Sequence, residues 1–191
     1  IKNIFSLLKK KNINSLDTAI NYGESEKNIG ELKKGVYKII TKLPKIPNKY
    51  DSKKKINIWV ENEISRSLKR LKAKQLYAVL LHHPEELLEK KGVYIYDALK
   101  SLKQNKKIQN IGISVYSTKI LKKIVKKFKI NIIQIPMNIF DRRILKPNIM
   151  NFLKENKIEI HARSIFLQGL LLLENDKIPK YFHRWSKLFK I

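Results

Sequence analysis

The stretch Leu16-Asp17-Thr18-Ala19-Ile20-Asn21-Tyr22-Gly23-Glu24-Ser25-Glu26 decides how the rest of the chain is interpreted. A strand-like run that begins at Ile13 leads to Asp17, and Tyr22 follows five residues later, just before a glycine. This pattern predicts a strand over 13–19 with Asp17 near its carboxyl end. It also predicts a loop that presents Tyr22 and a helix over 24–34.

Two later apolar runs also end in chemically useful residues. They are Ile39-Ile40-Thr41-Lys42 and Val79-Leu80-Leu81-His82-His83-Pro84. Three successive strands are therefore expected to end near Asp17, Lys42 and His82. Because the carboxyl ends of parallel strands lie on one side of a sheet or barrel, we expect these side chains to meet there, with Tyr22 in the loop beside them.

Helical and strand-like segments alternate along the whole chain. Helices are expected over 2–11, 24–34, 57–72, 94–103, after Ser117, over 147–154 and around Trp185 and Leu188. Strands are expected over 13–19, 36–42, 77–82, 108–115, 132–136 and 158–164, and the run 53–55 is interpreted as a solvated loop. The strands are apolar throughout, which is typical of a parallel sheet covered on both faces. We expect one α/β domain over residues 1–191.

The composition narrows the class of protein. The chain has 191 residues, 43% of them hydrophobic, which suits a folded domain with a real core. It has no cysteine, so disulfides and thiolate chemistry are excluded and a cytoplasmic setting is expected. No apolar run approaches the ~20 residues that span a bilayer, so no membrane partner is expected.

The formal net charge of +26 has two interpretations. A polyanion such as nucleic acid could bind the chain, or lysine could simply cover every solvated helix face. The lysines recur from Lys9 to Lys190 without the interleaved exposed aromatic residues expected of a nucleic-acid surface, and arginine is scarce. We favour the second interpretation and expect no specific nucleic-acid partner.

The four convergent side chains would suit proton transfer to a carbonyl oxygen. A free tyrosine has a pKa of ~10, and a neighbouring ammonium such as that of Lys42 would lower it. Asp17 would hold that ammonium charged and in place. A nearby His82 could orient a carbonyl oxygen or stabilise the oxyanion formed there.

With these residues in order, the chain resembles the aldo-keto reductase family. Asp17-Thr-Ala-x-x-Tyr22-Gly, Thr41-Lys42 and Leu81-His82-x-Pro84 match the family's tetrad motifs in order and spacing. Further matches are Ile111-Gly-Ile-Ser114-Val-Tyr116-Ser, Gln134-Ile-Pro-Met-Asn138, Asp141-Arg142-Arg143 and Arg163-Ser164-Ile-Phe-Leu-Gln-Gly169. Asp141-Arg142-Arg143 is given no catalytic role, since it could be a surface ion-pair cluster.

The resemblance implies a TIM barrel that reduces an aldehyde or ketone with NADPH, or NADH, as hydride donor. It implies that Tyr22 is the general acid, that Lys42 and Asp17 tune it, and that His82 positions the carbonyl. Cofactor contacts are expected from Asp17, Ser114, Gln134, Arg163, Ser164, Leu167 and Gly169. The substrate is expected to be a small carbonyl compound, and the oligomeric state stays open.

The sequence departs from the family pattern in two positions and in length. Val115 stands where many members have Asn, and Arg163 where many have an aromatic ring against the nicotinamide. By the family's pattern the chain starts in the first helix and stops after the seventh strand, so we expect an incomplete (β/α)8 barrel with six of eight strands, an excerpt or a truncated product. Two alternatives stay open: a non-catalytic remnant of such a reductase, and a basic polyanion-binding protein.

Overall fold

The computed structural model describes residues 2–185 as six strands with helices between them. The strands are β1 Ser15–Asp17, β2 Lys38–Leu43, β3 Leu76–Leu81, β4 Ile108–Ser114, β5 Ile132–Pro136 and β6 Glu159–Arg163. The helices are α1 Lys2–Lys10, α2 Ser25–Leu32, α3 Lys53–Arg70, α4 Gly92–Gln104, α5 Thr118–Val125 and α6 Pro147–Glu155. Short 3₁₀ turns cover Pro84–Leu88, Arg143–Leu145, Leu167–Leu172, Asn175–Lys177 and Lys180–Trp185.

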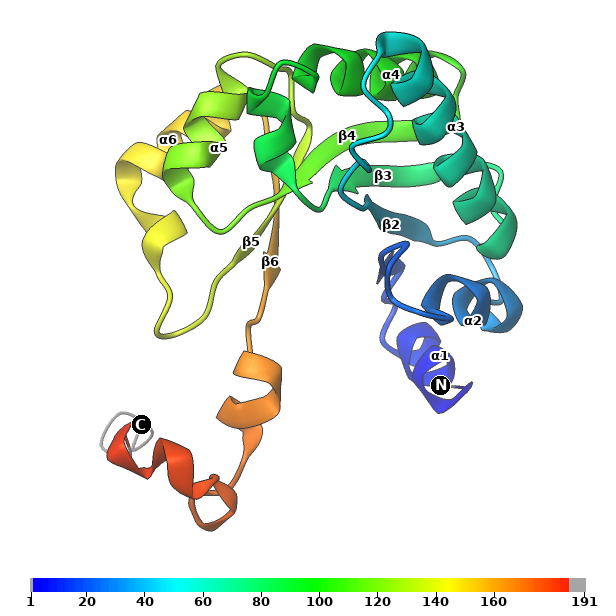
Figure 1. The fold of residues 1–191 in the computed structure, drawn as a ribbon. Coiled ribbons are helices and arrows are strands. Elements are labelled where there is room, and N and C mark those ends of the chain that lie inside the picture. The colour runs from blue at the N-terminus through cyan, green and yellow to red at the C-terminus, as the bar shows by residue number, and fades with distance from the viewer. Residues whose placement is uncertain (1, 186–191) are drawn as a thin grey trace.

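All six strands run parallel in the order β1-β2-β3-β4-β5-β6. Figure 1 shows that the sheet curls and that the helices pack on its outer face. The α3 and α4 helices cover one half of this face, and the α5 and α6 helices cover the other half. Within the described residues β1 and β6 are the edge strands and do not pair with each other. The expected incomplete (β/α)8 barrel is therefore confirmed as a curled half-barrel.

The sheet buries apolar side chains on both faces, as the apolar strands predicted. The convex face packs against the helices in one large cluster that includes Val79, Leu81, Ile113 and Ile133. The concave face carries a smaller cluster of Ile40, Ala78, Leu80 and Ile132, with Tyr77 packed against it. Because neighbouring side chains along a strand point to opposite faces, each apolar run supplies both layers.

The curl brings distant strands together at the amino ends of the sheet. The Tyr77 hydroxyl donates a 2.5 Å hydrogen bond to Glu159 Oε2, although β3 and β6 are not neighbours. This bond, reinforced by burial, raises the pKa of Tyr77 to about 12. His161 Nε2 lies 2.7 Å from the other oxygen of Glu159. Burial by itself raises the pKa of Glu159. The hydrogen bonds to Tyr77 and His161 outweigh this effect, so the pKa of Glu159 is lowered.

Helix α3 begins earlier than the sequence predicted. The run 53–55 was expected to be a solvated loop, but it forms the first turn of this helix. The Ser52 side chain accepts a 3.4 Å bond from the Lys55 backbone N–H, in the N-cap geometry that satisfies a free donor at a helix start. The lysines stay exposed, so the expectation was right about solvation and wrong about structure.

The other differences are at element ends. Strand β1 has three residues rather than seven, and β2 starts two residues later than expected. Ser117 is the N-cap of α5, as predicted, accepting from the Ile120 N–H. Trp185 ends a 3₁₀ turn, and Leu188 lies outside the described residues. Within residues 2–185 the longest apolar stretch of helix falls short of what crossing a bilayer requires.

Candidate active site

The predicted site residues do lie at the carboxyl ends of the strands. Asp17 ends β1, Lys42 is the last residue but one of β2, and His82 follows β3 directly. Ser114 ends β4 and Arg163 ends β6. Gln134 lies in β5, where it is the register partner of Ser114. The parallel sheet therefore gathers six predicted side chains at one end.

Lys42 is the buried centre of this group, with 2% of its side chain exposed. Its Nζ donates to Asp17 Oδ2 at 2.7 Å and to the Thr18 carbonyl oxygen at 2.8 Å. The second Asp17 oxygen accepts a 2.9 Å bond from Gln134 Nε2. A buried ammonium needs such partners, because an unpaired charge away from water is costly. The resemblance predicted Asp17 and Lys42, but not the role of the Thr18 carbonyl.

Tyr22 and His82 complete the quartet above the lysine. Lys42 Nζ lies 5.2 Å from the centroid of the Tyr22 ring, and the Tyr22 and His82 ring centroids are 5.9 Å apart at 75°. The Tyr22 N–H donates to the Ala19 carbonyl at 3.0 Å, and Gly23 follows with φ of 51°. Tyr22 stays 48% exposed, so its hydroxyl can meet a ligand that enters from solvent.

The electrostatics differ in one respect from the sequence-based expectation. Burial and then the Asp17 carboxylate raise the pKa of Tyr22, whereas a lowered value was expected from the lysine. Burial lowers the pKa of Lys42, against the opposing effect of Asp17. Burial and then the Lys42 charge lower the pKa of His82 from 6.5. Near neutral pH, Tyr22 is therefore a protonated phenol and His82 a neutral ring.

A buried carboxylate that the sequence analysis missed anchors the Tyr22 loop. Glu26 is 1% exposed and accepts hydrogen bonds from Thr41 at 2.7 Å, Ser67 at 2.6 Å and Arg70 Nε at 2.7 Å. It ties the start of α2 to β2 and α3. The sequence feature that accompanies this burial is Gly30, one turn after Glu26 in α2. A Cβ at Gly30 would lie 2.0 Å from the Arg70 carbonyl oxygen, so this face of α2 packs closely on α3.

Arg163 stands where the family pattern has an aromatic residue. Its planar guanidinium lies at the carboxyl end of β6. Its Cζ lies 3.9 Å from the centroid of the Tyr116 ring, a stacked cation–π pair. Its positive charge lowers the pKa of Tyr22, Lys42 and His82, as a secondary effect in each case. Arg163 therefore acts electrostatically on three members of the quartet.

The loop after β6 contains the remaining predicted cofactor contacts. Ser164 has φ of 56°, Leu167 46° and Gly169 95°, so left-handed backbone recurs within six residues. Leu167 N–H donates to the Ser164 carbonyl at 3.1 Å. The Gly169 N–H likewise donates to the Phe166 carbonyl at 2.9 Å, so both of these N–H groups are used within the loop.

Four other residues lie outside the quartet. Val115 is 2% exposed and packs in the convex-face core, so it offers nothing to a ligand on the other face. His83 is half exposed and lies 3.2 Å from Glu85. Arg143 and Asp141 form the surface ion pair that was one of the interpretations of that motif, at 2.8 and 2.7 Å. Among the described residues, no cluster of three His, Asp or Glu could hold a metal.

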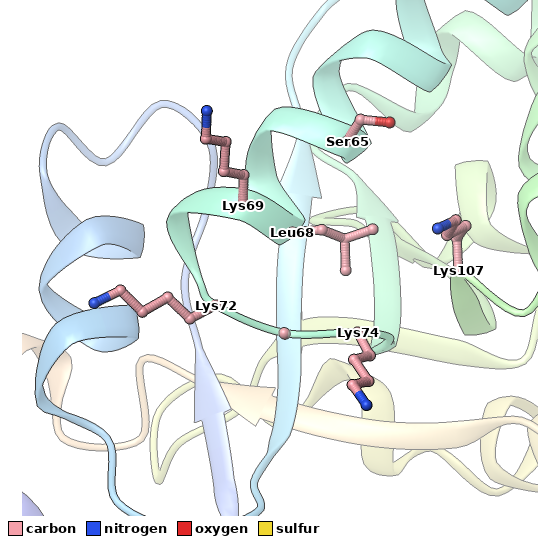
Figure 2. A pocket seen from close by; sticks show the side chains of 7 residues that line it. Ser65, Leu68, Lys69, Lys72, Lys74 and Lys107 are labelled. Carbon is pink, nitrogen blue, oxygen red and sulfur yellow. The ribbon is translucent and has the colours of Figure 1, made fainter.

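A lysine-lined hollow lies away from this site. Figure 2 shows it beside the carboxyl end of α3. Its lining includes Lys74 and Lys107, just before β3 and β4, and its volume is ≈ 570 Å³. Its basic residues are Lys69, Lys72, Lys74 and Lys107. Their side chains spread apart rather than meet (Figure 2), so the hollow offers no preformed anion site. It gives the polyanion-binding alternative no support.

Comparison with solved structures supports the same fold. The chain is similar to the holo form of aldo-keto reductase AKR11C1 from Bacillus halodurans, with 24% identity and a TM-score of 0.75 over 98% of this chain and 65% of that one. It is similar to the glycerol dehydrogenase AKR11B4 from Gluconobacter oxydans (24%, 0.71, 96% and 59%). It is also similar to an aldo/keto reductase from Klebsiella pneumoniae solved with NADP and acetate (19%, 0.65, 85% and 58%).

The chain spans 58 to 65% of the length of these three structures. A search of curated proteins gave no match. The sequence profile of the aldo/keto reductase family matches residues 3–189, nearly the whole chain. This match, together with the half-barrel and the quartet at the strand ends, shows that the chain belongs to the aldo/keto reductase family.

Proposed function

We propose that the protein reduces the carbonyl group of a small aldehyde or ketone with a hydride from NADPH, with NADH as the second possible donor. The observation that carries this proposal is the buried Lys42, fixed by Asp17 at 2.7 Å and placed 5.2 Å from the Tyr22 ring. A phenol beside a desolvated lysine and a neutral histidine is suited to giving one proton to a carbonyl oxygen.

The residues of the chain suit a nicotinamide cofactor. Gln134 uses one donor on Asp17, and its amide oxygen has no hydrogen-bond partner among the described residues. Ser114 lies beside it in register. A carboxamide both donates and accepts, so this hydroxyl and this amide could hold one. Ser164, Leu167 and Gly169 are proposed as cofactor contacts on the family match alone.

In this mechanism the cofactor supplies the hydride that reaches the carbonyl carbon. Tyr22 gives its phenolic proton to the oxygen, so the C=O group becomes CH–OH. His82, neutral at pH 7, hydrogen-bonds the same oxygen and orients it. Lys42 stabilises the phenolate left on Tyr22, and Asp17 keeps the ammonium in place. The proton returns to Tyr22 from solvent, which its exposure permits.

Replacing Tyr22 tests the proposal. In the full-length protein we expect Tyr22→Phe to lower kcat by about 10²-fold or more, the range of a general acid, while leaving NADPH affinity nearly unchanged. Tyr94→Phe, on the exposed side of α4, is the matched control and should keep wild-type turnover. Wild-type turnover in Tyr22→Phe would refute the role of the phenol.

The main alternative is a non-catalytic remnant of a reductase. It predicts no saturable binding of NADPH or NADH by the natural protein. Tight cofactor binding measured by protein fluorescence would exclude it.

A further inference from the structure

Arg163 has two hydrogen-bond donors that the protein itself leaves unused. Its Nε and Nη2 atoms are buried, and neither has a hydrogen-bond partner among the described residues. Buried N–H groups are nearly always paired in folded proteins, and those of a charged guanidinium are especially costly to leave alone. Such a group in a catalytic region indicates a ligand that the side chain is built to meet.

The two unused nitrogens lie on one edge of the guanidinium. This is the edge that binds a carboxylate with two parallel N–H···O bonds. Arg143 in the same protein uses it in this way, with Nε 2.8 Å from Asp141 Oδ1 and Nη2 2.7 Å from Oδ2. Within residues 2–185, Arg163 presents the same fork with no acidic partner.

The position of Arg163 places its side chain on the same face of the sheet as the reacting groups. It is the last residue of β6, two residues after His161, the register partner of the concave-face residue Gln134. Side chains two apart on a strand share a face, so Arg163 faces the side that carries Lys42 and Asp17. Its effect on the pKa of Tyr22, Lys42 and His82 agrees with that placement.

The Tyr116 ring packs against the guanidinium of Arg163. Its centroid lies 3.9 Å from Cζ, and Tyr116 is itself 67% exposed. This contact restrains the guanidinium, which reduces the freedom lost on binding. Nε and Nη2 are shielded in this structure, so an anion reaches this edge only when a covering side chain moves aside.

Resting on the function proposed above, we propose that Arg163 binds a carboxylate of the substrate. The substrate is then an oxo-acid, an aldehyde or ketone that also carries a carboxylate group. Its carbonyl oxygen meets Tyr22 and His82, and its carboxylate takes the Nε/Nη2 edge of Arg163. Selection between substrates follows from this pair of contacts, since a neutral carbonyl compound leaves the guanidinium unpaired.

The test is a ratio of two aldehydes in the full-length protein. We expect kcat/KM for 4-carboxybenzaldehyde to exceed that for benzaldehyde, and Arg163→Met to lower this ratio about 100-fold. Arg163→Lys keeps the charge without the fork, and it should restore only part of the ratio. Arg143→Met, which removes an exposed arginine outside the site, should keep the wild-type ratio.

Binding of benzoate, measured by calorimetry, is a readout independent of turnover. Wild-type protein should bind benzoate but not benzamide, and Arg163→Met should lose the benzoate site. If both aldehydes are reduced equally well, or the ratio survives Arg163→Met, the carboxylate site is overturned and the reductase assignment stands. If Arg163→Met lowers the affinity for NADPH and leaves benzoate binding intact, Arg163 binds the cofactor instead. The proposal is then also overturned.

Failure of the reductase assignment itself gives a different pattern. Neither aldehyde would then be reduced with NADPH or NADH. Binding of benzoate that depends on Arg163 would still support the carboxylate site. If benzoate did not bind, the carboxylate site would be overturned as well.

Discussion

The Asp17 carboxylate accepts a 2.9 Å hydrogen bond from the Gln134 amide, although three strands lie between β1 and β5 in the sheet. In a flat sheet of ~4.8 Å strand spacing these side chains would be far apart. The bond therefore records the curl of the half-barrel at the end where the quartet lies. It also orients Asp17, whose other oxygen binds Lys42.

Gln134→Ala should consequently destabilise the fold as well as loosen Asp17. The expected loss in the free energy of unfolding is about 1.5–3 kcal/mol, the value of a hydrogen bond to a charged group. Urea denaturation measures it. Gln109→Ala, which removes an exposed amide bonded to Gln75, should cost less than about 0.5 kcal/mol. Equal losses in the two variants would contradict a special role for the Asp17 bond.

Glu26→Gln should be among the most damaging single changes in the described part of the chain. It leaves Arg70 without its carboxylate and faces an amide N–H₂ toward the hydroxyls that donate to it. Breaking a buried ion pair costs about 3–5 kcal/mol. Glu24→Gln is the control, since the Glu24 pair with Lys27 is exposed and should contribute under about 1 kcal/mol. Urea unfolding of both variants tests this contrast.

Gly112→Ala should strain the centre of the sheet. A Cβ on this β4 residue would lie 2.3 Å from Leu80 Cδ2 and 2.6 Å from the Ile132 carbonyl oxygen. Both neighbours are fully buried, so the strands must separate, at about 1–3 kcal/mol. Gln104→Ala, at the exposed end of α4, should change the unfolding free energy by less than about 0.5 kcal/mol. Thermal unfolding of the two variants decides it, and an unchanged midpoint for Gly112→Ala would refute the crowding.

His82 should make folding stability depend on pH in the mildly acidic range. Because burial and the Lys42 charge lower its pKa below 6.5, the unfolded chain protonates at His82 before the folded protein does. Stability from this group is therefore complete above pH 6.5 and is lost as the pH falls below that value. His82→Gln should flatten the pH dependence of the urea midpoint below pH 6.5. Gln104→Ala, which carries no titrating group, should keep the wild-type slope, and identical slopes in all three proteins would contradict the assignment.

The sequence was sufficient for the sheet and for the meeting of Asp17, Lys42 and His82. Parallel strands bring their carboxyl ends to one side, so placing a residue at a strand end already places it in space. The direction of the Tyr22 pKa could not be obtained in this way. It depends on whether the rise in pKa caused by burial and by the Asp17 charge exceeds the fall expected from the lysine. These effects depend on distances and burial in the folded protein.

The burial of Glu26 was hidden for a different reason. A glutamate in the first turn of a helix is normally solvated, and the helix dipole stabilises its negative charge. The sequence around Glu26 is therefore that of a surface residue. Only the packing of α2 against α3 places it beside Thr41 and Arg70. The α3 start was likewise obscured by the lysine run, although Ser52 before it was a readable cap.

The order β1 to β6 has a kinetic meaning. Every strand docks on the strand that precedes it in the chain, so register partners lie only 20 residues apart (Gly112 with Ile132) to 38 apart (Lys42 with Leu80). Closing the longer of these loops costs only about 0.6 kcal/mol more than closing the shorter. Each βα unit can therefore be added in turn to an existing edge at a similar entropic cost. Chain synthesis and sheet growth can therefore run in the same direction.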